Sequence, residues 1–265
     1  MQIFRRKGVS MESGVLIGIG FVGAFVSGLL GIGGAILLVP MLLYVPPGLG
    51  LPGFRMGDVA GMTIVQVLVA SLVGMLTHRK QGAFSTKVAL PMAIAIGFGA
   101  AAGGLASGRV PDVLLKALFA LLALVAALLM VWPVRAPLEG DVPEDFQTGW
   151  AAAIAGTVGV LSGLVGAGGA FMLAPMMRSV LRLPIRVIIG SSLAIVLSSA
   201  VLGTIGKAVS GQIPWAQTAF LVVGSMAGAP LGAKTSHRLN VQSLRWMLAG
   251  LIALTAGNML WKLRG

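Results

Sequence analysis

The residues with the strongest chemical character form a run of glycines between apolar side chains, and the run occurs twice. The sequence SGLLGIGGA begins at Ser27, and SGLVGAGGA begins at Ser162, 135 positions further on. Each copy is followed at the same distance by a proline and a methionine, at 40–41 and 175–176. Glycine costs about 1 kcal/mol relative to alanine inside a helix, so function or close packing must offset that cost. The matched spacing indicates an internal repeat.

A glycine run of this kind can interrupt a transmembrane helix and free backbone groups to face a cavity or another segment. The half-helix after the interruption carries unsatisfied N–H donors and about half a positive charge at its first turn. Two such ends near the membrane midplane would form an anion site without a buried arginine, and Ser27 and Ser162 could add hydroxyl donors. The alternative is that small residues only let helices approach closely. Two copies in register favour the functional interpretation.

Polar residues within other apolar stretches extend the candidate site. Gln66 is the strongest of them, because an interior glutamine needs hydrogen-bond partners in lipid. Lys207 either extends its head group to the interface or faces a polar path, and the glycines and serine around it favour the interface. The predicted substrate-binding residues are Ser27, Gly28, Gly31, Gly33, Gly34, Thr63, Gln66, Ser162, Gly163, Gly166, Gly168, Gly169, Ser191 and Ser192.

The acidic residues indicate the sign of the ligand. All seven lie outside the apolar stretches or at their ends: Glu12, Asp58, Asp112, Glu139, Asp141, Glu144 and Asp145. Carriers of organic cations and pumps with carboxylate relays normally keep such a group within the membrane, so we expect an anionic or neutral solute. A metal site is disfavoured, because the chain has no cysteine and only two histidines, His78 and His237.

Composition places these residues in a membrane protein. The chain of 265 residues is 57% hydrophobic and only 10% charged, with a mean hydropathy of +0.98, whereas soluble domains carry about 25% charged residues. Continuous apolar runs and a single tyrosine argue for helices rather than a strand barrel. The net charge of +12 sits in short clusters between these runs, which suits anchoring to lipid headgroups and not a nucleic-acid partner.

Eight hydrophobic helical elements are expected, since a helix needs about 20 apolar residues to cross a bilayer. The charge-free stretches are 13–54, 59–77, 88–108, 117–134, 146–177, 187–206, 208–233 and 246–261. The first and fifth contain the glycine motif and are too long for one ordinary span, so each is expected to be broken or re-entrant there. The first is expected to end near Tyr44, before a loop rich in proline and glycine.

The chain divides into two repeats of about four elements each. Residues 1–134 form the first transmembrane repeat, 135–148 an acidic linker, and 149–265 the second repeat. Beyond the motif the halves correspond at an offset of 129 positions, pairing for example Gly99 with Gly228 and Gly103 with Gly232. The distribution of lysine and arginine does not decide between parallel and inverted repeats.

At these residues the sequence resembles the sulfite exporter TauE/SafE family of bacterial membrane proteins. The resemblance rests on the paired glycine motifs with Pro40 and Pro175, and it extends through the small-residue stretches 61–82 and 190–211. It implies seven or eight spans in two repeats and the export of a small sulfur-containing anion, such as sulfite or an organosulfonate, across a bacterial inner membrane.

The expected function is therefore that of a secondary transporter, a multi-pass protein of the inner membrane whose partners are a small anion and the lipid bilayer. A passive anion channel, or a carrier of another small organic anion, is the alternative. No cofactor is expected, and catalysis is not expected, because Ser27 has no histidine in its half except His78 at the rim of an apolar stretch. The sequence leaves the substrate, the coupling ion, the orientation and the oligomeric state open.

Overall fold

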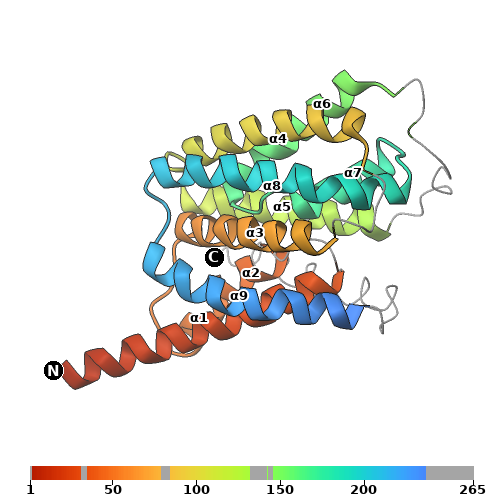
Figure 1. Ribbon diagram of the computed structural model, residues 1–265. Coiled ribbons are helices and arrows are strands. Elements are labelled where there is room, and N and C mark those ends of the chain that lie inside the picture. The colour runs from red at the N-terminus through yellow and green to blue at the C-terminus, as the bar shows by residue number, and fades with distance from the viewer. Residues whose placement is uncertain (1, 31–34, 79–83, 132–141, 143–145, 237–265) are drawn as a thin grey trace.

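The computed structural model describes residues 2–30, 35–78, 84–131, 142 and 146–236 (Figure 1). Within these ranges the chain is helical and contains no strand. The described residues form nine helices: α1 (Gln2–Leu30), α2 (Ala35–Gly48), α3 (Met56–His78), α4 (Thr86–Ser107), α5 (Asp112–Val131), α6 (Thr148–Val165), α7 (Ala170–Ser179), α8 (Ile185–Val209) and α9 (Trp215–Ser236).

Several of these helices have the length and composition of membrane spans. In the described part of the chain, five are long and apolar enough to cross a membrane: α3, α4, α5, α6 and α8. Large apolar side chains also point outward, since Phe98 on α4 is 69% exposed and Leu128 on α5 is 58% exposed. Outer surfaces of this kind suit lipid rather than water. The protein is therefore a multi-pass helical membrane protein.

Two closely packed helix pairs lie on opposite sides of the bundle, with α1 along α9 and α4 along α6 (Figure 1). Both contacts depend on glycine. A Cβ added to Gly228 on α9 would overlap the backbone of Phe21 on α1, and a Cβ added to Gly99 on α4 would overlap the carbonyl of Gly156 on α6. In each pair, the next glycine along one helix contacts the partner helix one turn further along it, so the two helices of each pair are parallel. Small residues allow this backbone approach.

The helices α3, α5 and α8 lie between these two pairs (Figure 1). On α3, Gly61 meets the backbone of Gln212, while Ile64, one turn later, meets Gly203 on α8. The contacts move backwards along α8 as they move forwards along α3, so these two central helices are antiparallel. Together they form the scaffold against which the second glycine motif packs.

The helices follow the predicted apolar stretches closely. The first and fifth stretches each contain two helices, α1 with α2 and α6 with α7. The expectation that the first stretch ends near Tyr44 is wrong, because α2 continues to Gly48 and includes Pro46 and Pro47. Each proline lacks the N–H that would bond to the preceding turn, and α2 ends one residue after this pair. The eighth stretch, 246–261, and nearly all of the acidic linker lie outside the described residues.

Candidate functional site at the second glycine motif

The second glycine motif is the point at which α6 ends and α7 begins. The C-cap of α6 is Gly166, with a φ of 74°. Gly168 and Gly169 follow with φ values of 63° and 73°, and α7 starts at Ala170. Only glycine adopts this left-handed region without strain. Backbone conformation therefore explains three of the four glycines in this copy.

The end of α6 is attached to α3. Thr63 Oγ1 donates to the Gly166 carbonyl oxygen at 2.9 Å, and it also lies 2.8 Å and 3.2 Å from the carbonyl oxygens of Val59 and Ala60. A Cβ on Gly166 would overlap the Ala60 carbonyl. All three acceptors of the hydroxyl are backbone carbonyls, so Thr63 positions the break rather than donating to a ligand in this conformation.

The start of α7 lies deep in the protein, halfway along its neighbours. A Cβ on Gly168 would touch Val67 at the centre of α3, and one on Gly169 would touch Ile96 at the centre of α4. No side chain caps this helix end. Within the described residues, the amides of positions 168–171 have no acceptor. A buried cluster of free donors with the partial positive charge of a helix start is suited to an anion.

Gln66 lies on α3, next to Val67, at the same depth. Its side chain is 0% exposed, and among the described residues neither Oε1 nor Nε2 has a hydrogen-bond partner. An unpartnered buried amide costs about 1–3 kcal/mol. A glutamine retained at that cost requires an explanation other than packing.

The other predicted residues divide by location. Ser162 is buried and donates to the Gly159 carbonyl oxygen at 3.1 Å, and its Oγ is 3.3 Å from the Cβ position of Gly169. Gly163 packs on the backbone of Ala100. In the first motif, Ser27 and Gly28 belong to the last turn of α1, whereas Gly31, Gly33 and Gly34 lie outside the described residues.

Ser191 and Ser192 are not near the second motif. Ser191 is buried and accepts a hydrogen bond from the Ser85 amide at 3.3 Å, and Ser85 is the N-cap of α4. That contact is about 16 Å along α4 from Ile96, given a rise of 1.5 Å per residue. Ser192 is half-buried beside it. Matching depth in the sequence grouped these serines with Thr63, but only Thr63 bonds to the second motif.

A hollow of about 290 Å³ lies between α3 and α8, lined by Met75, Ala194, Leu197, Ser198, Val201 and Leu202. Ser198 supplies its polar side chain, and that hydroxyl donates to the Ala93 carbonyl oxygen at 2.7 Å. The remaining lining is apolar. This hollow offers little to an anion and is separate from the start of α7.

Lys207 contradicts the expectation that its head group reaches the interface. Its side chain is 0% exposed. The ammonium Nζ donates to Ser107 Oγ at 2.7 Å, Gln212 Oε1 at 2.6 Å and the Leu164 carbonyl oxygen at 3.1 Å. The surrounding glycines and serine do mark a helix end, as predicted, since α8 stops at Val209. The head group turns inward because three oxygens converge there, two of them from the distant residues Ser107 and Leu164.

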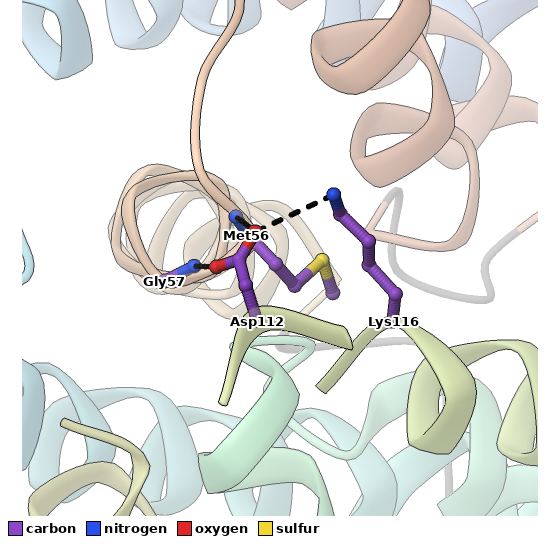
Figure 2. Close-up of polar contacts among 4 residues, drawn as sticks. All are labelled: Met56, Gly57, Asp112 and Lys116. Carbon is purple, nitrogen blue, oxygen red and sulfur yellow. Dashed lines mark hydrogen bonds and ion pairs between the residues drawn. The ribbon is translucent and has the colours of Figure 1, made fainter. Parts of the chain in front are cut away.

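The same end of the bundle contains a carboxylate that caps a neighbouring helix (Figure 2). Asp112, in the first turn of α5, accepts from the Met56 amide at 3.0 Å and from the Gly57 amide at 3.4 Å, both at the start of α3. Lys116 lies 3.4 Å from the same carboxylate. The start of α3 is thus capped across two helices, unlike the start of α7.

Comparison with known proteins finds relatives named as probable membrane transporters. The chain is 31% identical to a probable membrane transporter protein of Xylella fastidiosa strain Temecula1, over 85% of each chain. It is 23% identical to the probable membrane transporter protein YunE of Bacillus subtilis, over 94% of this chain and 97% of that one. A probable membrane transporter protein of Haemophilus influenzae is 24% identical over 92% and 96% of the two chains. No solved structure matches the chain.

The family comparison covers nearly the whole sequence. Residues 16–259 match the model described as Sulfite exporter TauE/SafE. The match includes both glycine motifs and all of helices α2 to α9. The chain belongs to the sulfite exporter TauE/SafE family.

Proposed function

We propose that this protein is a secondary transporter of the bacterial inner membrane that exports a small sulfur-containing anion, such as sulfite or an organosulfonate. Membership of the TauE/SafE family and the relatives named as probable membrane transporters support transport. The observation that carries the anion assignment is the uncapped, buried start of α7, halfway along α3 and α4.

The chemistry of this helix start supports an anion. Within the described residues the amides of positions 168–171 have no acceptor, so they are available to donate to a sulfite or sulfonate oxygen, and the helix dipole adds partial positive charge there. Asp58 and Asp112 lie in the first turns of α3 and α5, away from this depth. In the proposal Gln66 adds an amide donor, Ser162 turns its hydroxyl from the Gly159 carbonyl to the ligand, and Thr63 holds the break in place.

The packing of the two halves supports inverted repeats. Phe21 on α1 meets Gly228 on α9, and the positions equivalent to these in the other half are 156 and 99, which also meet. Phe25 with Gly232 and Val160 with Gly103 form a second equivalent pair. The equivalent helices α3 and α8 are antiparallel. Such inverted repeats commonly underlie alternating access, in which one half rocks against the other around a central site.

The direction of transport follows from the membrane potential. An inside-negative potential favours the exit of an anion by about 2.3 kcal/mol per charge per 100 mV. The sequence has no nucleotide-binding motif, so the proposed coupling is to an ion gradient, the potential or the substrate gradient itself.

The test uses purified protein in vesicles and measures sulfite, sulfonate, sulfate and carboxylate flux. We expect saturable flux with trans-stimulation for sulfite or a sulfonate. Flux that neither saturates nor shows trans-stimulation would favour the channel alternative, and flux confined to carboxylates would contradict the substrate class.

Gln66→Leu tests the site. Leucine removes two unpartnered polar atoms at similar volume, so stability should be kept or raised. Flux at low substrate concentration should fall by about tenfold, which corresponds to about 1.4 kcal/mol of lost binding. Ser71→Ala is the matched control, because Ser71 is also buried on α3 but bonds only to the Leu68 carbonyl of its own helix. Unchanged flux in the Gln66 variant would remove Gln66 from the site.

A further inference from the structure

The buried ammonium of Lys207 lies at the meeting point of helix carboxyl ends. Ser107 is the last residue of α4, Leu164 is the second-last residue of α6, and Lys207 itself is in the last turn of α8. Gln212 follows in the turn before α9. Each helix end carries about half a negative charge. The three ends together form a strongly cation-attracting position inside the bundle.

The acceptors of Lys207 are all neutral oxygens: a hydroxyl, an amide oxygen and a backbone carbonyl. The ion pair identified among the described residues joins Lys116 to Asp112, so no carboxylate contacts the Lys207 ammonium there. The positive charge is therefore balanced mainly by helix ends and oriented oxygens rather than by a counter-ion.

In membrane transporters, hydroxyls, free carbonyls and helix carboxyl ends are the groups that coordinate Na⁺. We propose that the oxygens of Ser107, Leu164 and Gln212 form a monovalent-cation site, and that the Lys207 ammonium is its built-in cation. The lysine then does permanently what a bound Na⁺ would do reversibly. It joins the ends of α4, α6 and α8 and so closes this end of the bundle without a soluble ion.

This proposal does not depend on the substrate. If the protein is the carrier proposed above, one further consequence is that Na⁺ is not needed to close this end. The ammonium cannot leave with the substrate, because four methylene groups tether it to α8.

Removal of the side chain tests the cation site directly. In Lys207→Ala, the three oxygens lose their cation, and we expect Tm in detergent to fall by about 5 °C or more. Ethylammonium chloride or NaCl should restore part of that loss, whereas choline chloride at the same ionic strength should not. The native protein should respond equally to all three salts.

Lys234→Ala is the matched control, since Lys234 also lies in the last turn of a helix but is exposed. Its Tm should not depend on the kind of cation. A Lys207→Ala protein whose Tm matches the native value, or responds equally to every salt, would overturn the proposal. Because the readout is Tm, failure here is distinct from failure of the anion flux assay.

A second variant keeps the proposal testable if Lys207→Ala does not fold. Gln212→Glu puts a carboxylate in place of the neutral amide whose Oε1 now lies 2.6 Å from the ammonium. We expect a higher Tm than that of the native protein, since the charge gains a direct counter-ion. A Tm as low as that of Gln212→Ala would show that the site does not need more negative charge, and would overturn the assignment.

Discussion

The two helix ends at the second glycine motif have opposite characters. The carboxyl end of α6 directs the Leu164 carbonyl to a buried ammonium, so its negative end is satisfied within the protein. The amino end of α7 has no capping side chain, and within the described residues its first amides have no acceptor. One interruption thus creates two helix ends of opposite charge, and the described residues satisfy only the negative one.

The largest expected effect comes from the residue that joins these two ends. Gly166→Ala forces a side chain into φ of 74° and into the Ala60 carbonyl, and should cost at least about 3 kcal/mol of stability. Gly149→Ala is the control, because nothing lies within 4 Å of its Cβ position. Thermal unfolding in detergent measures both. Equal Tm values for the two variants would mean that the tight turn is not needed.

A smaller effect is expected from the tether between α3 and the break. Thr63→Val removes the hydrogen bond to the Gly166 carbonyl and should cost about 1–2 kcal/mol. Thr63→Ser keeps the hydroxyl and should keep most of the stability. Flux should follow the same order if the tether positions the amides of α7. A valine variant as stable and active as the serine variant would contradict this role.

The smallest effect concerns a helix start that does have a carboxylate. Asp112→Ala exposes the start of α3 and should cost about 1 kcal/mol. Lys116→Ala should cost less, because its ion pair with Asp112 is partly exposed, at 33% and 27%. Chemical denaturation of both variants measures the difference. If the lysine variant were the less stable, the ion pair and not the cap would hold this end.

The sequence predicted much of this molecule where local patterns decide the structure. Apolar stretches separated by charges marked the helices, and the glycine spacing marked the place where α6 gives way to α7. Those features depend on composition and on the conformational freedom of glycine. They do not require knowledge of distant contacts.

The environment of Lys207 could not be predicted in that way. Its neighbours correctly indicated a helix end, but the three oxygens around it come from residues 107, 164 and 212. The residues next to position 207 do not indicate that these oxygens converge there. The same holds for Ser191, whose partner Ser85 lies 106 positions away. Burial of polar groups depends on tertiary packing, and a local pattern does not encode it.

The pairing of α1 with α9 also constrains how the protein is made. Ser225 on α9 donates to the Gly20 carbonyl on α1, across 205 positions of sequence. During synthesis α1 is made long before α9 exists, so the α1 backbone around Gly20 and Phe21 stays without the partner that later covers it. The pairing of these two helices therefore comes late in assembly, after nearly all of the chain has left the ribosome. A truncated chain that ends before α9 would lack the glycines at 224, 228 and 232 that allow this close approach.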